Sequence, residues 1–214
     1  YIAQALKEFE EDHSEIDSRL LLMQQQNLKN QIYTWLSEEK KRPIFQIKDL
    51  EKTVEIKINR IRFNIRIDRI DVIQNKYELI VDYKTGKNPT TRKAFFSDTL
   101  TDLQIPIYAC FLPNKNLAGV AIAHINRRKI NLYGITSSKI ENITPQLNNK
   151  IDHPVAKDWS GLLSMWQQRL EKTAEQYLSG NASVTFNKNT DFTYCEVLPL
   201  LRLAEKKYQF EQYK

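Results

Sequence analysis

A β-hairpin near the middle of the chain is the feature that most constrains the fold. Two stretches rich in Ile, Val and Tyr, residues 63–73 and 77–84, are separated by a short polar segment centred on Asn75. This pattern predicts two antiparallel strands joined by a turn. With Asn75 at the turn, Asp68 lies across from Asp82, and directly opposed Cβ atoms in such a pair are about 4.5–5.5 Å apart. The hairpin therefore predicts two carboxylates close together.

Lys84 adds a positive charge to this pair. Side chains alternate between the two faces of a strand, so Asp82 and Lys84 share a face. Two carboxylates at this separation repel each other, and a proton or a cation must relieve the repulsion. Mg²⁺ suits such a site because it keeps several waters and takes few protein ligands. A lysine there can orient a water or stabilise charge on a phosphate, which is typical of phosphodiester cleavage. The simpler interpretation is a surface hairpin with ordinary ion pairs.

Three motifs together resemble a known family. The hairpin carries IRIDRID and IVDYKTGK, and LQIPIYA follows further along the chain. These segments are similar to motifs of the RecB/AddB-type nuclease domain within the PD-(D/E)XK superfamily. The resemblance implies that Asp68 and Asp82 bind the metal and that Lys84 is catalytic. It also implies that Gln104 and Tyr108 support the site from a helix.

The resemblance spans residues 45–205 and implies an α/β fold, a restriction-endonuclease-like mixed central β-sheet flanked by helices. One departure is Ile65, which stands where the family usually has Gly, a local backbone difference that leaves the chemical groups in place. The implied activity is that of a Mg²⁺-dependent deoxyribonuclease, with Mn²⁺ as an alternative and the backbone carbonyl of Tyr83 as a further ligand. Such domains commonly belong to helicase–nuclease complexes. An exonuclease that acts on DNA in repair or recombination, beside a helicase subunit or domain, is therefore expected.

Basic residues around the hairpin are expected to contact the DNA backbone. Arg66 lies on the first strand, and Lys87, Arg92 and Lys93 follow the second. Contacts between cationic side chains and phosphates supply affinity that does not depend on base sequence. Glu51 precedes the hairpin where the family often has a Glu near the active site, although an acidic residue in a charged stretch is commonly a surface residue.

Other titratable residues are assigned structural roles. Arg69 and Asp71 point away from the Asp68 side of the strand and are expected to pair with each other. His13, near the amino terminus, is expected to be a capping or surface residue. His124, at the end of an apolar strand, is expected to be structural.

The composition fits one globular α/β domain. With 214 residues, of which 41% are apolar and 27% charged, the chain is long enough to bury one core. Its net charge of +6 suits a polyanionic partner but is weak support by itself. No apolar run reaches the length of a membrane span. The two cysteines, Cys110 and Cys195, do not suggest a disulfide framework, so a reducing cytoplasm is expected.

An iron–sulfur cluster is not expected. The segment TYCEVLPLLRLAE resembles the part of the family that carries the cluster ligands, but only Cys195 remains there. Phe192 and Leu201 occupy two of the other positions. Such a cluster needs four thiolates.

Changes in periodicity divide the single predicted domain, residues 1–214, into three parts. They are a helical lead-in (1–43), the core sheet with the active site (44–135) and a helical carboxy-terminal part (158–214). The polar segment 12–14 is expected to separate two helices and to cap the second. Pro106 favours a helix that begins near Gln104, because proline is tolerated only in the first turn. Tyr1 lies inside an amphipathic pattern, so the segment is expected to be the carboxy-terminal part of a longer chain.

Two other functions were weighed. The first is a catalytically silent nuclease-like module that binds DNA or serves as a scaffold in a helicase–nuclease complex. Retention of Asp68, Asp82 and Lys84 together argues against it, because clustered charges are costly to keep without a use. The second is a sugar- or nucleotide-binding α/β domain, which lacks support because the sequence has no Gly-rich phosphate loop.

Overall fold

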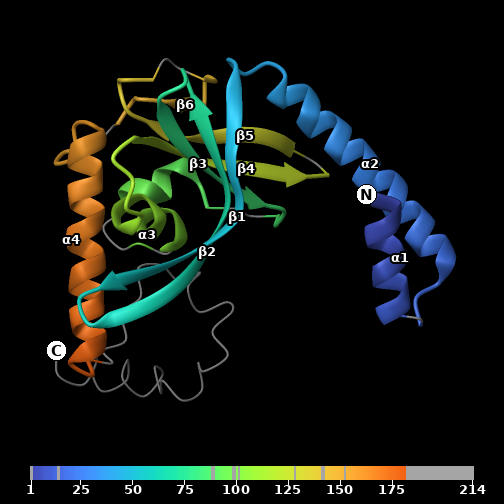
Figure 1. The fold of residues 1–214 in the computed structure, drawn as a ribbon, viewed down its shortest axis with the longest axis horizontal. Coiled ribbons are helices and arrows are strands. Elements are labelled where there is room, and N and C mark those ends of the chain that lie inside the picture. The colour runs from blue at the N-terminus through green and yellow to red at the C-terminus, as the bar shows by residue number, and fades with distance from the viewer. Residues whose placement is uncertain are drawn as a thin grey trace, which may run out of the picture. The chain divides into compact units, whose positions relative to one another are not determined.

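The computed structural model describes residues 2–13, 15–87, 90–97, 100, 102–127, 129–140, 143–151 and 153–181. The expectations for Cys195 and its neighbours lie outside these residues. The chain divides into two compact units, Tyr1–Lys172 and Thr173–Lys214, and the β-sheet belongs to the first. The elements in chain order are α1 (Ile2–Asp12), α2 (Ser18–Glu39), β1 (Phe45–Ile58), β2 (Ile61–Ile73), β3 (Tyr77–Lys84), the 3₁₀ helix η1 (Arg92–Phe96), α3 (Gln104–Phe111), β4 (Leu117–Asn126), β5 (Lys129–Thr136), β6 (Leu147–Asn148) and α4 (Trp159–Leu178) (Figure 1).

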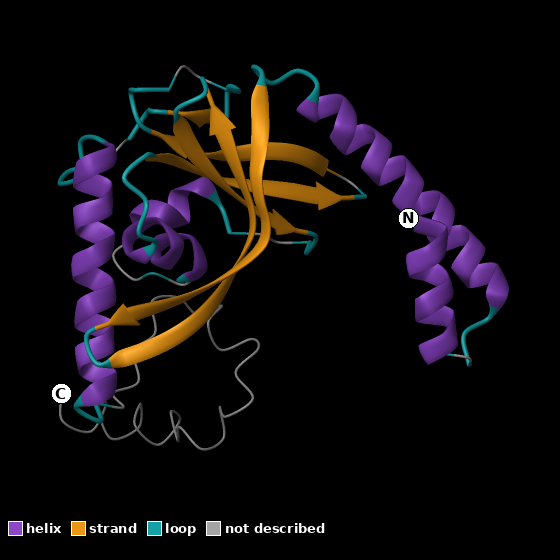
Figure 2. Ribbon diagram, viewed as in Figure 1, coloured by secondary structure: helices purple, strands orange, loops and turns teal. Residues whose placement is uncertain are grey.

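The six described strands form one mixed sheet in the order β1-β2-β3-β4-β5-β6. β3 pairs with β4 in parallel, as β5 does with β6, and the other neighbours are antiparallel. A parallel pair needs a crossover connection, and here η1 and α3 supply it between β3 and β4. Figure 2 shows the strands as a twisted sheet with helices beside it. The predicted α/β fold, a restriction-endonuclease-like mixed sheet flanked by helices, is confirmed.

The central hairpin has the predicted register. β2 and β3 pair from Arg69 opposite Val81 to Ile73 opposite Tyr77, which places Asn75 at the centre of the turn. Gln74 and Asn75 have φ angles of 54° and 53°, and the Lys76 amide donates to the Ile73 carbonyl at 3.2 Å. Asn tolerates the left-handed conformation better than most residues, so the turn sequence agrees with its geometry.

β1 and β2 extend well beyond the rest of the sheet. Their ladder runs from Phe45 opposite Ile73 to Ile58 opposite Ile61, with an irregularity between Ile47 and Asp49. β3 pairs only with the second half of β2, so residues 61–68 of β2 have β1 as their one described strand neighbour. Residues 45–58, which precede the hairpin, are thus a single long strand.

The sheet is buried on both faces. One face carries a core that includes Ile80, Ile122 and Ile135, and α3 and the first part of α4 cover it through residues such as Ile105 and Trp166. The opposite core comprises Trp35 of α2, Ile73, Leu79, Val81, Ala118, Ala121, Ala123, Leu132, Ile140, Ile143 and Leu147. Since Ile80 belongs to the first core and Val81 to the second, β3 alternates as a strand between two layers must.

The helix α3 begins at Gln104, as the position of Pro106 predicts. In the first turn of a helix the backbone N–H has no intrahelical partner, so proline costs little there. The consequence is that Gln104 is the first residue of a helix whose amino terminus lies beside the end of β3.

Two expectations are corrected. The residue that caps α2 is Asp17, whose carboxylate accepts the Arg19 amide at 2.8 Å, and not the polar segment 12–14. The stretch 136–157, predicted to be only a connection, contains β6, so the sheet continues beyond residue 135.

None of the described helices combines the length and apolar character that crossing a bilayer requires.

Candidate active site

Asp82 lies in the centre of the sheet with its charge almost fully buried. It is 1% exposed, and the strands on both sides of β3 exclude water from it. Among the described residues, no donor reaches Oδ1 of Asp82. The ammonium group of Lys84 lies 2.9 Å from Oδ2 and is the ion-pair partner of Asp82. Buried carboxylates normally have several donors, so the oxygens of Asp82 are available for a further cationic group.

The electrostatics of this pair favour a bound cation. Burial raises the pKa of Asp82, and the nearby carboxylates of Asp68 and Asp102 raise it further, while Lys84 opposes the shift. For Lys84, burial acts against the ammonium, but the interactions with Asp82 outweigh it and the pKa is raised. Lys84 is therefore a cation at neutral pH. A divalent cation beside Asp82 would relieve the same repulsion that raises the pKa of this carboxyl.

Asp68 lies where β2 separates from β3. The described ladder between these strands ends at Arg69, one residue before Asp68. The carboxylate of Asp68 then accepts a hydrogen bond from the backbone N–H of Tyr83 at 2.8 Å. This bond fastens Asp68 to the peptide unit between Asp82 and Lys84. The structure thus places Asp68 beside Asp82, in agreement with the predicted register.

Helix α3 holds Lys84 from the other side. The side-chain carbonyl of Gln104 accepts a hydrogen bond from the Lys84 ammonium at 2.5 Å. The Gln104 amide donates to the Tyr108 hydroxyl at 2.7 Å, and this hydroxyl donates to the backbone carbonyl of Arg66 at 2.7 Å. Burial, followed by the nearby Asp82 and Asp68 carboxylates, raises the pKa of Tyr108, so the phenol stays protonated and keeps its donor role. A continuous chain of hydrogen bonds joins Lys84 to β2.

Asp102 and Tyr133 were missed in the sequence and belong to the same region. The Asp102 carboxylate accepts hydrogen bonds from the backbone N–H of Gln104 at 3.1 Å and from the Thr90 hydroxyl at 2.5 Å. Tyr133 of β5 donates to the Thr90 carbonyl at 2.5 Å. Burial and the charges of Asp82 and Asp102 raise the pKa of Tyr133 to about 12. An acidic residue just before a helix is a recognisable start signal, which identifies Asp102, but no local pattern points to Tyr133.

The predicted DNA-binding residues have different surroundings. Arg66 forms an ion pair with Glu51 at 2.9 Å, and both side chains are exposed. Glu51 has a φ of 49°, uncommon for a residue with a side chain. Lys87 and Lys93 are exposed. Arg92 instead turns inward, and its guanidinium donates to the carbonyls of Gly134 and Lys150 and to the side-chain carbonyl of Asn148.

Two of the three histidines, His13 and His124, make contacts with neighbouring residues, and His13 does not cap α2. His13 stacks on Phe9 with ring centroids 4.2 Å apart. His124 is buried, and its Nε2 lies 2.9 Å from the Gly86 carbonyl, which ties the loop after β3 to the end of β4.

The residues present fit a small divalent cation. Within the described residues there is no group of three His, Cys, Asp or Glu side chains arranged for a metal. Asp68 lies beside Asp82, and Oδ1 of Asp82 has no donor among the described residues. Mg²⁺ is often held by one or two carboxylates together with waters and substrate phosphates. The carboxylates of Asp68 and Asp82 are ligands of that kind.

The geometry corresponds to a family defined by an acidic residue separated from a lysine by one position. A family model described as the PD-(D/E)XK nuclease superfamily matches residues 1–200. The chain belongs to the PD-(D/E)XK nuclease superfamily. Members of this superfamily are typically metal-dependent nucleases that use divalent ions such as Mg²⁺. In this PD-(D/E)XK domain Asp82, Tyr83 and Lys84 stand at the acid–x–lysine motif.

Other comparisons add little to this assignment. No curated protein matches the chain. The solved structure described as "Crystal structure of SSO0001" is similar over 90% of this chain and 80% of that chain, with 16% sequence identity and a TM-score of 0.34.

Proposed function

We propose that this PD-(D/E)XK domain is a Mg²⁺-dependent DNA nuclease that hydrolyses phosphodiester bonds. The observation that carries the proposal is the environment of Lys84. Its ammonium contacts the buried carboxylate of Asp82 on one side and the side-chain carbonyl of Gln104 on the other, and Oδ1 of Asp82 has no donor among the described residues. A buried carboxylate with a single cationic partner and an oxygen without a donor is costly to keep for stability alone.

Asp68 and Asp82 would hold the metal, with the backbone carbonyl of Tyr83 as a further ligand. The ion would supply charge neutralisation for the phosphate and for the leaving 3′ oxygen. Asp68 also fixes the backbone of Tyr83, so the two carboxylates keep their separation when substrate binds. Both roles are performed by residues on adjacent strands of the sheet.

Lys84 acts as a cationic donor and not as a resting general base. Its raised pKa keeps the ammonium protonated, so it can donate to the attacking water and to a phosphate oxygen while charge develops there. The water oxygen bonds to phosphorus as the bond to the 3′ oxygen breaks; the water releases one proton to solvent, and the 3′ oxygen takes up a proton from solvent and leaves as a hydroxyl group. Gln104, anchored by Tyr108, restricts the position of the Lys84 ammonium.

The mode of cleavage and the cellular role are proposed from the RecB/AddB-like motifs and not from the metal site. They support a DNA exonuclease of the cytoplasm that acts in repair or recombination beside a helicase. Arg66, Lys87 and Lys93 are exposed and remain proposed phosphate contacts, whereas the inward-turned Arg92 would act mainly by holding the backbone. Cleavage of linear single- and double-stranded DNA in Mg²⁺ and in Mn²⁺ tests the activity.

Replacing Lys84 with Ala should strongly reduce this cleavage, and circular dichroism checks that the variant is folded, because it leaves the buried Asp82 without its ion-pair partner. Loss of the donor that faces the developing charge costs about 10²- to 10³-fold in rate. Lys57→Ala is the matched control, because Lys57 is an exposed lysine on β1. This variant should cut DNA at the wild-type rate. If Lys84→Ala cleaved normally, the assignment would be wrong. Binding of DNA without cleavage by the wild type would favour the silent binding module.

A further inference from the structure

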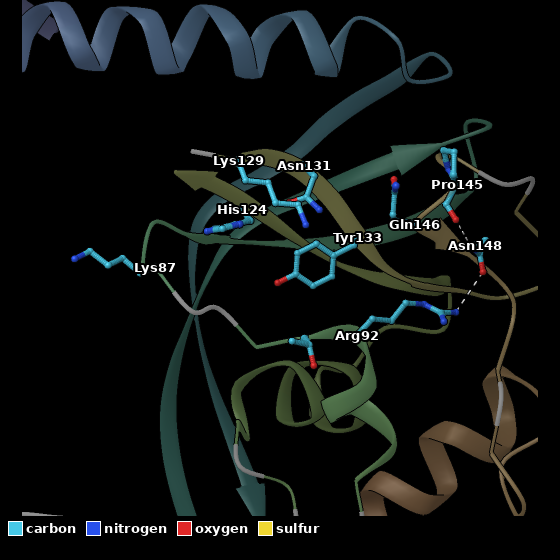
Figure 3. A pocket seen from close by; sticks show the side chains of 10 residues that line it. Lys87, Arg92, His124, Lys129, Asn131, Tyr133, Pro145, Gln146 and Asn148 are labelled. Atoms are coloured by element: carbon cyan, nitrogen blue, oxygen red, sulfur yellow. Dashed lines mark hydrogen bonds between the residues drawn. The ribbon is translucent and has the colours of Figure 1, made fainter. Parts of the chain in front are cut away.

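A cleft of about 590 Å³ opens on the sheet beside the proposed active site (Figure 3). Its walls come from the loop after β3, from β4 and β5, and from the segment that contains β6. None of the described lining residues is acidic. The lining residues are Lys87, Thr91, Arg92, His124, Lys129, Asn131, Tyr133, Pro145, Gln146 and Asn148.

Tyr133 connects this cleft to the active site. Figure 3 shows its ring in the middle of the cleft, between His124 and Arg92. Its hydroxyl donates a hydrogen bond to the Thr90 carbonyl, and the Thr90 hydroxyl donates to the Asp102 carboxylate. The same carboxylate accepts a hydrogen bond from the backbone N–H of Gln104. The cleft and the lysine-holding helix therefore share one hydrogen-bonded support. A strand that leaves the active site towards β5 would enter this cleft.

Two lysines give the cleft an available positive charge. Lys87 and Lys129 are exposed, and their ammonium groups form no hydrogen bond or ion pair with another residue that the structure describes. Arg92 differs, because its guanidinium is occupied by Gly134, Asn148 and the Lys150 carbonyl. Free ammonium groups without acidic neighbours suit phosphate groups, and Arg92 serves to keep the wall in place.

Asn131 supplies an unused acceptor in the wall. Its side-chain oxygen is buried, and no donor among the described residues reaches it. Figure 3 shows Asn131 beside Lys129 and His124, above the ring of Tyr133. An acceptor that is buried without a donor costs free energy, and a ligand N–H group would remove that cost. The groups that recognise phosphate and those that recognise a base edge thus occur in the same cleft.

The polar surface continues beyond Lys129. This lysine also lines a second cleft of about 400 Å³, whose other walls are mainly amide and hydroxyl side chains of α2 and the end of β4. They are Asn27, Asn30, Gln31, Thr34, Asn126 and Arg127, with Ile130 of β5. Lys129 therefore lies in the lining of both clefts.

We propose that the cleft around Tyr133 binds an unpaired nucleotide of the DNA strand that is cut, next to the scissile phosphate. Lys87 and Lys129 contact the backbone phosphates, and Asn131 accepts a hydrogen bond from the base. The volume is in the range of pockets for small ligands, about 300–1,000 Å³. In a duplex the Watson–Crick edge of each base is occupied by the partner base, so only an unpaired base can offer that edge to Asn131. This proposal rests on the proposed nuclease function and specifies a single-stranded end as its substrate.

Binding can be measured without cleavage, by fluorescence anisotropy in EDTA with a labelled single-stranded oligonucleotide and with a blunt duplex of the same sequence. The wild type should bind the single strand more tightly than the duplex. Lys129→Ala should weaken single-strand binding and reduce its salt dependence by about 0.7, the slope expected for one phosphate contact. Lys57→Ala, which removes an exposed lysine far along β1, should bind as the wild type does. Equal affinity for single strand and duplex, or an unchanged salt slope in Lys129→Ala, would overturn the proposal.

The variant Asn131→Leu distinguishes an effect on the cleft from an effect on the active site. Its rate of oligonucleotide cleavage should be about tenfold below that of the wild type, as expected for the loss of one hydrogen bond. Its rate on bis(p-nitrophenyl) phosphate, which is too short to reach the cleft, should fall less. An equal loss on both substrates would mean that the variant damages the active site, and the cleft assignment would fail while the nuclease assignment stood. If the wild type cut neither substrate but single-strand binding still depended on Lys129, the nuclease function would fail and the cleft would stand.

Discussion

The two faces of β3 carry charged clusters that are satisfied in opposite ways. On one face, Asp82 has Lys84 as its ion-pair partner, and its Oδ1 has no donor among the described residues. On the other face, the side chain of Tyr83 accepts a hydrogen bond from Arg69 at 2.9 Å. Both clusters are buried, and they are separated by the thickness of a single strand.

The cluster on the Tyr83 face is a network of ion pairs. Arg69 contacts Asp71 at 2.5 Å and Glu39 at 2.8 Å, which confirms the predicted pair of Arg69 and Asp71. Arg42 contacts the same two carboxylates, at 2.7 Å to Asp71 and 2.6 Å to Glu39. Each carboxylate thus has two cationic partners. The network also joins the end of α2 to the central hairpin.

This difference teaches that burial of charge does not by itself mark a functional site. In the network around Arg69 each carboxylate has two cationic partners, and the group left without a partner among the described residues is a donor, Nε of Arg42, so the network has no vacant acceptor for a cation. Asp82 is equally buried, yet it has one cationic partner, its Oδ1 lacks a donor among the described residues, and its pKa is raised. A surplus of unsatisfied acceptors distinguishes the site that calls for a cation from the site that is already balanced.

Arg69→Met should have the largest effect of the predicted substitutions, and this effect should be on the free energy of unfolding. The substitution keeps the length of the side chain but leaves Glu39 and Asp71 with Arg42 alone. Breaking a buried ion pair by removing one partner costs about 3–5 kcal/mol of unfolding free energy. Urea unfolding followed by circular dichroism measures the loss. Arg19→Met, at an exposed pair with Asp17, should leave the unfolding curve unchanged. A similar curve for both variants would show that the network is dispensable.

Asp82→Asn should have the opposite effects to Arg69→Met: cleavage is lost and stability is kept. Cleavage of DNA should fall by about 10²- to 10³-fold, because the neutral amide no longer contributes to holding a cation or to placing Lys84. The free energy of unfolding should not fall, because the substitution removes a desolvated negative charge. A nuclease assay and urea unfolding of the same preparation measure both. Loss of stability comparable to that of Arg69→Met would remove the distinction between the two faces.

The pH dependence sharpens this contrast. The folded-state pKa of Asp82 lies above its ordinary value of 3.8, because of burial first and then the nearby carboxylates. The contribution of this group to stability is thus fully present below pH 3.8 and is lost as the pH rises through the folded pKa. In EDTA, the unfolding free energy of Asp82→Asn relative to the wild type should increase with pH across this window and then level off. A difference that is independent of pH would contradict the raised pKa.

Gln104→Leu should have the smallest of these effects, confined to catalysis. The leucine cannot accept the Lys84 hydrogen bond, and bonds to charged groups contribute about 1.5–3 kcal/mol, which corresponds to about 10- to 150-fold in rate. Because Gln104 positions Lys84, kcat should fall more than KM changes, and Gln104→Glu, which keeps an acceptor, should restore part of the rate. Gln24→Leu, on the exposed side of α2, is the control. A change in KM alone would assign Gln104 to substrate binding instead.

The amino-acid sequence by itself determined the local elements of this protein. The alternation of apolar residues and a left-handed turn at Asn75 specify the hairpin and its register, which places Asp68 near Asp82. Pro106 specifies where α3 begins, and the two-residue period specifies that Arg69 and Asp71 share a face. These features depend on residues close in the chain, whose geometry the backbone dictates.

Only the tertiary structure decided which distant residues meet at the site. The parallel pairing of β3 with β4 and the return of β5 bring Tyr133 to Thr90, and they turn Arg92 inward to Gly134. The orphaned state of Asp82 is likewise a property of everything packed around it, not of its neighbours in the sequence. Periodicity carries no information about contacts between segments so far apart, because these depend on how the whole sheet and its covering helices exclude water.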